Sequence, residues 1–192
     1  MKQYKGFESK MTADFEQLPV GGYVCKIMNA EVLPVRNGGE RMNLAIDIDE
    51  GDYKGFFTKQ YKEDTREDKK WRGNFNIFLP RDDGSEQDTW AKNRFNNLIG
   101  CVEDANDGFH WDWDEKKLKG KKIALVFRRE EYHKTDGTTG WSVKPFKAIS
   151  IGNCLDGKWG KYEDKPLSEN KRTSAPVTDL VEDMTADDLP FN

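Results

Sequence analysis

Aromatic and basic side chains stand close together at several points of this 192-residue chain. An aromatic ring can stack on an unpaired nucleobase, and a neighbouring Lys or Arg can neutralise the phosphate beside it. The residues that combine these properties are Arg36, Arg41, Lys59, Tyr61, Trp71, Arg72, Arg128, Lys144 and Phe146. We expect these positions to form a surface that binds a single nucleic-acid strand.

Other chemistry has weaker support in the sequence. Four carboxylates, Asp47, Asp49, Glu50 and Asp52, are close enough in sequence to suggest a Mg²⁺ site of the kind that nucleases use. They fall at a strand end and a turn, where a solvated acidic turn is the commoner explanation. The sequence has no phosphate-binding GxxxxGK[ST] motif and no Cys or His spacing typical of zinc. We therefore expect a protein that is not an enzyme and that needs no metal or cofactor.

The charge of the chain is unevenly distributed. The net charge is −4, but the last sixteen residues, Val177–Asn192, hold five carboxylates and no Lys or Arg, which leaves about +1 for the rest. We expect this segment to be a disordered acidic tail, because it lacks the apolar surface needed to fold. No apolar run approaches the roughly 18 residues of a membrane span, and no signal peptide is visible. The expected location is the cytoplasm, away from membranes, with Cys25, Cys101 and Cys154 as free thiols.

The acidic tail ends in an apolar hook. Asp187 and Asp188 are followed by Leu189, Pro190 and Phe191. A tail of this charge is often only a solvating device. The combination of acids with Pro-Phe, however, resembles the C-terminal tip of bacterial and phage single-stranded DNA-binding proteins. That resemblance implies that residues 187–191 bind replication or recombination enzymes.

The elements that must position the candidate residues follow from hydrophobic periodicity. Alternation predicts strands at 23–34 and 42–48, the second with one buried and one wet face, and further strands at 53–61, 120–128 and 141–151. Residues 62–70 form a predicted charged loop, and 71–80 either a separate strand or a continuation of the third. Ser85 and Asp88 resemble a capping box, and the apolar spacing beyond them predicts an amphipathic helix of about four or five turns.

This order, three strands, a helix and two strands, is typical of the OB-fold. We expect a mainly β protein, an OB-fold-like five-stranded barrel with one helix. The predicted organisation is a lead-in at 1–19, the barrel at 20–160, and a flexible linker with the acidic tail at 161–192. Phe57, Phe75 and Trp141 are expected to fill its core, whereas Tyr61, Trp71 and Phe146 are the stronger candidates for base stacking.

Two motifs extend the resemblance to the barrel. Leu18–Tyr23 reads LPVGGY and Ile48–Gly55 reads IDEGDYKG, and both are similar to motifs in a family of small phage and prophage proteins, some of which are single-stranded DNA-binding proteins of phage replication. The resemblance implies a protein that coats single-stranded DNA in phage replication or recombination within the bacterial cytoplasm. Self-association is an open alternative. A protein-interaction adaptor without DNA binding is a second function, and a metal-dependent nuclease is a weaker third.

Overall fold

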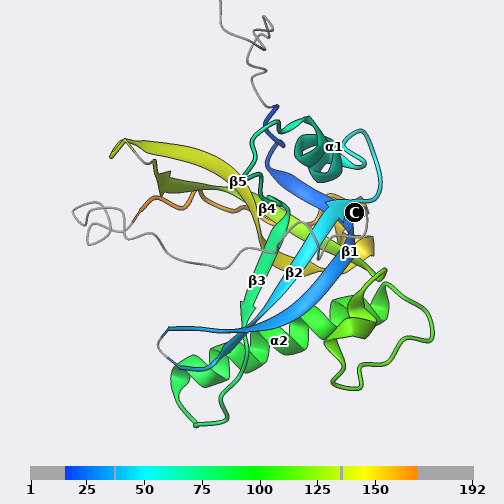
Figure 1. The fold of residues 1–192 in the computed structure, drawn as a ribbon. Helices are drawn as coiled ribbons and strands as arrows, with labels where there is room; N and C mark the ends of the chain where they lie inside the picture. Colours follow the sequence, from blue (N-terminus) through cyan, green and yellow to red (C-terminus); the bar gives the residue numbers. More distant parts are fainter. Residues whose placement is uncertain (1–15, 37, 135, 168–192) are drawn as a thin grey trace, which may run out of the picture.

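A computed structural model describes residues 16–36, 38–134 and 136–167. Its elements, in chain order, are β1 (Gly21–Pro34), β2 (Glu40–Ile48), α1 (Phe56–Glu63), β3 (Asn74–Phe78), α2 (Glu86–Asp104), the 3₁₀ turn η1 (Glu115–Leu118), β4 (Lys122–His133), β5 (Thr139–Ile149) and α3 (Ile151–Leu155) (Figure 1).

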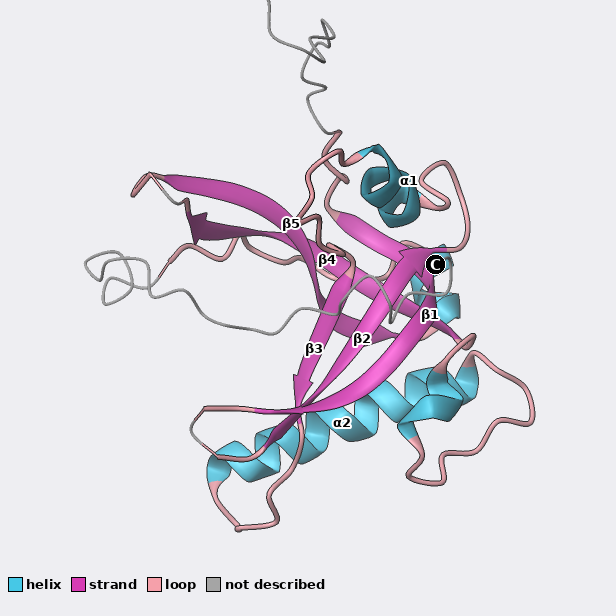
Figure 2. Ribbon diagram, viewed as in Figure 1, coloured by secondary structure: helices cyan, strands magenta, loops and turns pink. Residues whose placement is uncertain are grey.

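The strands form one antiparallel sheet in the order β3-β2-β1-β4-β5. The sheet is strongly curved, so that β3 and β5, at its two ends, contact each other (Figure 2). The predicted fold class, a mainly β, OB-like five-stranded architecture with a helix between the third and fourth strands, is therefore confirmed. β4 pairs with β1 only as far as Phe127. Beyond that point β4 and β5 continue without β1 as a two-stranded arm, made of residues 128–133 and 139–144 (Figure 1).

Helix α2 bridges the two end strands. It begins where the capping pattern predicts, because the Ser85 side chain accepts a hydrogen bond from the Asp88 backbone N–H at 3.1 Å. Its apolar side packs on the barrel core. Beside this apolar surface, Arg94 Nη2 and Asn97 Nδ2 donate to the backbone oxygens of Phe146 and Ala148, at 2.7 and 2.9 Å. These side chains satisfy acceptors on the edge of β5.

The core fills the inside of the curved sheet. As expected, Phe57 and Phe75 are buried in it, whereas Trp141 is only half-buried, on the arm. The wet face predicted for β2 is wrong, because the strand is buried on both faces from Met42 to Ile48. Asn43 and Asp47, which were expected to be solvated, are 2% and 5% exposed.

The third predicted strand is also wrong, because residues 56–63 form helix α1. Asp47 explains the difference: its carboxylate accepts hydrogen bonds from the backbone N–H groups of Phe57 and Thr58, at 2.9 and 3.1 Å, and so caps the start of this helix. Phe57 and Tyr61, four residues apart, then face the core. The third strand of the sheet is β3, within the predicted 71–80 region.

The end of the barrel differs from the prediction as well. β5 stops at Ile149, and Ser150 caps α3 by accepting from the Asn153 backbone N–H at 3.3 Å. Residues 161–167 were expected in a flexible linker, but they lie against the domain. Lys165 donates its backbone N–H to the Arg129 oxygen and accepts from the Glu131 N–H, both at 2.9 Å, which covers the edge of β4 that β1 leaves free.

In the lead-in, Leu18 is buried in the core, and residues 1–15 fall outside the described part. The predicted acidic tail also lies outside the described residues. None of the helices within residues 16–36, 38–134 and 136–167 has the length and apolar character that a membrane span requires.

Candidate nucleic-acid interface

Phe146 occupies a β-bulge on β5. The register pairs Val126 with Lys147 and Phe127 with Pro145, so Phe146 is an extra residue opposite no partner. A bulge redirects the side chain of the inserted residue. The Phe146 ring packs with the small cluster of Val24, Val126 and Ile149, which is separate from the main core. It therefore lies on the outer face of the sheet.

The Arg128 side chain covers this ring. The carbon at the centre of its guanidinium group is 4.4 Å from the ring centroid, a cation–π arrangement. Glu130 holds Arg128 with an ion pair of 2.9 Å. Lys144 lies directly opposite Arg128 in the β4–β5 register and is exposed. An arginine stacked on a ring, with an exposed lysine opposite it on the neighbouring strand, is suited to contact both a base and its phosphate.

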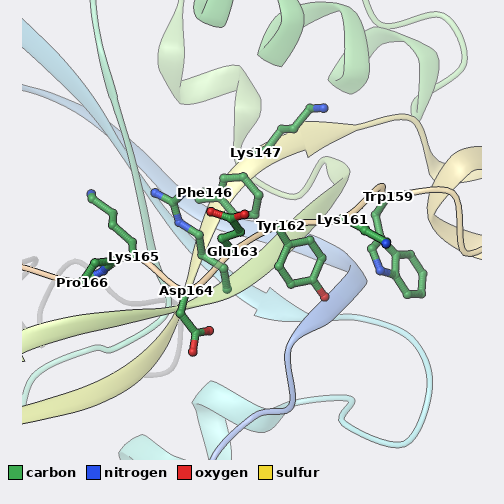
Figure 3. Close-up of a pocket in the computed structure, with 10 residues that line it drawn as sticks. Phe146, Lys147, Trp159, Lys161, Tyr162, Glu163, Asp164, Lys165 and Pro166 are labelled. Carbon is green, nitrogen blue, oxygen red and sulfur yellow. The ribbon is translucent and has the colours of Figure 1, made fainter.

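The C-terminal segment completes a groove over this ring. Tyr162 lies 5.9 Å from Phe146, centroid to centroid, with the rings tilted by 58°. Burial raises the pKa of Tyr162, so its hydroxyl group stays neutral at physiological pH. The groove has a volume of about 420 Å³ and is lined by Arg128, Phe146, Lys147, Trp159, Lys161, Tyr162, Glu163, Asp164, Lys165 and Pro166 (Figure 3).

Helix α2, which packs along β5, carries a second pair of an aromatic ring and an arginine. Trp90 is 52% exposed, and the guanidinium of Arg94 lies 4.8 Å from its ring centroid. Arg94 also donates to the backbone oxygen of Phe146, which places its guanidinium group beside the residue whose ring Arg128 covers. Burial lowers the pKa of Arg94, and the charge of Arg128 lowers it further. Trp90, Arg94, Arg128, Phe146 and Tyr162 thus alternate rings with positive charges, and we name this set the Arg–aromatic stripe.

Of the acidic groups near the groove, Asp164 and Glu130 pair with cations, whereas Glu163 is exposed in the lining. Asp164 pairs with Arg129 at 3.3 Å, and Glu130 lies 3.6 Å from Lys165 in addition to its pair with Arg128. Lys147 and Lys161, by contrast, are exposed at the groove. The positive charge available to a ligand is therefore a local feature of a chain that is acidic overall.

In comparisons with known proteins, no family model and no curated protein matches this chain. The residues and their geometry therefore have to indicate the function.

The residues predicted from the sequence to bind DNA lie in several separate parts of the structure. Arg128, Lys144 and Phe146 come together on the stripe side of the arm. Lys59 and Arg72 are exposed near α1, away from the predicted strand face. Tyr61 and Trp71 are buried in the core, 6% and 2% exposed, and Trp71 Nε1 donates to the Gly73 oxygen at 3.0 Å. These two rings cannot stack on a base, so their prediction as platforms is wrong.

Arg36 and Arg41 lie at the β1–β2 hairpin. Arg36 is exposed, whereas Arg41 faces the same side of the sheet as its cross-strand partner Phe78, which is 57% exposed. This is the outer face of strands 2 and 3, where OB-folds bind ligands. Among the described residues, Arg41 Nε and Asn43 Oδ1 are buried there without a hydrogen-bond partner. The face provides polar groups and one exposed ring beside the basic hairpin.

The carboxylates of the acidic turn take part in structural contacts. Asp47 is used as the cap of α1, while Asp49 and Glu50 pair with Lys122 at 3.5 and 2.7 Å. Within the described ranges no group of three His, Cys, Asp or Glu side chains is placed to hold a metal ion. The predicted partner-binding residues Asp187, Asp188, Leu189, Pro190 and Phe191 lie outside the described part of the chain.

Sequence reasoning missed several groove and stripe residues. Trp159, Lys161 and Tyr162 alternate rings and charges in the segment KWGKY, which the predicted domain boundary at residue 160 divides between barrel and linker. Trp90 and Arg94 are four residues apart on α2, a spacing that places them on one face of a helix.

Proposed function

We propose that this protein binds single-stranded DNA along the Arg–aromatic stripe, without strong sequence preference, in phage DNA replication or recombination. The observation that carries the proposal is the stacking of Arg128 on Phe146 beside the exposed Lys144 and the Tyr162 groove. Rings of this kind accept any base, because every base has a π face. Duplex DNA keeps its bases stacked inside the helix and cannot use them.

The groove favours binding over catalysis. Its described lining consists of cations, aromatic rings and carboxylates, one of which pairs with Arg129, and rings beside cations are the groups that bind a single strand. In this proposal the cations follow the phosphate backbone and the rings receive successive bases. The acidic tip at 187–191 recruits a replication or recombination enzyme, as the sequence resemblance implies.

The test is the fluorescence anisotropy of labelled oligo-dT at low and moderate salt, with a duplex of equal length as the control. We expect tighter binding to oligo-dT, with log K falling at roughly −0.7 per phosphate neutralised as log salt rises. The double variant Lys147→Glu/Lys161→Glu should weaken this binding, whereas Lys54→Glu, an exposed site after β2, should not. Equal affinity for duplex and single strand contradicts the proposal.

The near-neutral charge of residues 1–176, about +1, favours one alternative, an adaptor that binds only proteins. The adaptor predicts no affinity for oligo-dT even at low salt. A variant with Phe191→Ala separates the two activities. It should keep wild-type affinity for oligo-dT and lose binding to the enzyme that the tail recruits.

A further inference from the structure

Residues 158–167 form a strap across the groove that lies over Phe146, and most of them line that groove (Figure 3). The strap follows helix α3 and contains no helix of its own. Its pairing with the sheet is the bridge between Lys165 and Glu130 of β4. The contacts at the two ends of the strap therefore determine whether it can move.

The first end of the strap is firmly anchored. The Trp159 ring packs against the small hydrophobic cluster that includes Val24 and Cys154. The Lys158 backbone N–H donates to the Asn153 oxygen of α3 at 2.8 Å. Buried apolar contacts of this kind resist local opening.

The second end of the strap is attached to the edge of β4 by weaker contacts. Two backbone hydrogen bonds, both 2.9 Å long, join Lys165 to Arg129 and Glu131. Two ion pairs accompany them, Asp164 with Arg129 at 3.3 Å and Lys165 with Glu130 at 3.6 Å. The side chains of Asp164 and Arg129 are 46% and 49% exposed, so water and salt weaken their attraction. Exposed attachments with few buried contacts are typical of a segment that opens locally.

A glycine between the two ends can act as a hinge. Gly160 has a φ of +77°, and no atom lies within 4 Å of the position that a Cβ would take. The backbone can therefore rotate at this residue without a steric clash. Tyr162 lies beyond the hinge and contacts Phe146, with 5.9 Å between the ring centroids. Detachment of the second end would carry the Tyr162 ring away from Phe146.

We propose that the strap is a clamp that admits and then encloses a single nucleic-acid strand. The strap turns at Gly160 and leaves the edge of β4, so that a base can reach the Phe146 ring. Renewed pairing of Lys165 with β4 then closes the groove over the strand, and the Asp164 carboxylate returns to Arg129, where the two charges cancel. This inference rests on the proposed function, because it describes how the groove takes up and retains its ligand.

Opening of the strap can be measured without DNA. Amide hydrogen exchange is followed residue by residue by NMR. The amides of Lys165 and Glu131 should be far less protected than that of Ile27, which donates to the Lys121 oxygen inside the barrel. Equal protection at Lys165 and Ile27 means that the strap opens only when the whole domain unfolds, and this result overturns the clamp.

A pair of charge variants locates the opening. Asp164→Ala removes the ion pair with Arg129 and should speed exchange at Lys165 by about 2- to 5-fold. The matched control is Asp156→Ala, which removes an equal charge and the pair with Lys158 on the anchored side of the hinge. The control should leave exchange at Lys165 unchanged. An equal effect of the two variants contradicts an attachment at β4.

A reversible crosslink tests whether opening is needed for binding. Glu130→Cys/Lys165→Cys places two thiols at bridge partners, whereas the native cysteines are buried. The oxidised protein should bind labelled oligo-dT at least about tenfold more slowly than the same protein after reduction, because opening of the strap controls entry. Oxidation of the preformed complex should slow release of the oligonucleotide. The reduced form is the matched control, since both forms have the same sequence.

The outcomes separate the clamp from the proposed function. Equal association rates for the oxidised and reduced forms overturn the clamp and leave single-strand binding in place. Failure of the wild-type protein and of the reduced variant to bind oligo-dT contradicts the proposed function, and with it a clamp for a single strand. Amide exchange at Lys165 then shows, independently of DNA, whether the strap opens.

Discussion

Arg94 of α2 donates a hydrogen bond to the backbone oxygen of Phe146, at 2.7 Å, and so ties the helix to the bulge on β5. Phe146 is consequently held twice, through its backbone by Arg94 and through its ring by Arg128. An edge strand exposes unpaired carbonyl groups. Here a helix side chain satisfies one of them, at the residue whose half-buried ring is covered by Arg128. One contact therefore ties α2 to the bulge that carries the candidate stacking ring.

Replacing Phe146 with Ala should weaken binding to oligo-dT by roughly 5- to 150-fold, because a base–aromatic stack contributes about 1–3 kcal/mol. Phe146→Trp keeps a stacking face and should retain most of the affinity. The matched control is Trp113→Ala, an exposed ring outside the stripe, which should bind as the wild type does. Anisotropy titrations at fixed salt measure all three. Wild-type affinity for Phe146→Ala would remove the stripe as the DNA site.

Replacing Asp47 with Ala should lower the free energy of unfolding by about 2–4 kcal/mol, measured by urea denaturation. The carboxylate is buried and accepts from the backbone N–H groups of Ile48, Phe57 and Thr58, which would be left unsatisfied. Asp49→Ala, at a more exposed position of the same turn, should change stability by less than about 1 kcal/mol.

This variant also bears on the nuclease alternative. A catalytic Asp47 would predict that DNA is degraded in the presence of Mg²⁺ and that the loss of Asp47 abolishes the reaction without unfolding the protein. Intact DNA with wild-type protein and Mg²⁺, together with a destabilised Asp47→Ala, agrees with the structural role.

Asp64 should make stability depend on pH in the acid range. Its side-chain hydrogen bonds to Arg66, with a contact of 2.6 Å, lower the pKa of the buried carboxyl to about 2. A pKa depressed in the folded state gives stability that is complete above the ordinary carboxyl pKa and is lost as pH falls towards 2. Asp64→Asn should therefore flatten the decline in urea midpoint between about pH 4 and pH 2. Asp52→Asn, an exposed carboxylate in the turn after β2, should keep the wild-type slope.

Long periodic segments made most of the fold predictable. β1, β2, α2 and β4 lie close to where the sequence placed them. Each is long enough for its apolar residues to distinguish the helical period of about 3.6 residues from the strand period of 2. Helix α1 was missed because its eight residues, FFTKQYKE, fit both periods. The group that decides between them is Asp47, which is distant in sequence and acts through hydrogen bonds to Phe57 and Thr58. The hydrophobic pattern of residues 56–63 alone does not reveal that contact.

The candidate site was also only partly predictable, because part of it depends on contacts between segments that are far apart in sequence. Arg128, Lys144 and Phe146 could be found from residue type and neighbours alone. The bulge at Phe146, however, depends on the β4–β5 register, and the role of Tyr162 depends on residues 161–167 covering the edge of β4. Tyr61 and Trp71 have the same basic neighbours as true surface rings. They are buried because α1 turns Tyr61 inward and because the Gly73 oxygen accepts from the Trp71 indole.

Replacing Gly22 with Ala should test whether Trp159 is needed at the groove. An added Cβ would lie 2.8 Å from the Trp159 ring and 3.1 Å from Cys154 Sγ, so the indole must move. Overpacking of this kind costs about 1–3 kcal/mol of stability. Because Trp159 lines the groove beside Tyr162, affinity for oligo-dT should fall in the same variant.

Gly152→Ala, on α3 with open space around its Cβ, is the control that should preserve both stability and binding. If Gly22→Ala loses stability but binds oligo-dT at full strength, Trp159 only packs on the cluster of Val24, Val126 and Ile149. The DNA-binding surface then consists of Phe146, Arg128 and the α2 residues of the stripe.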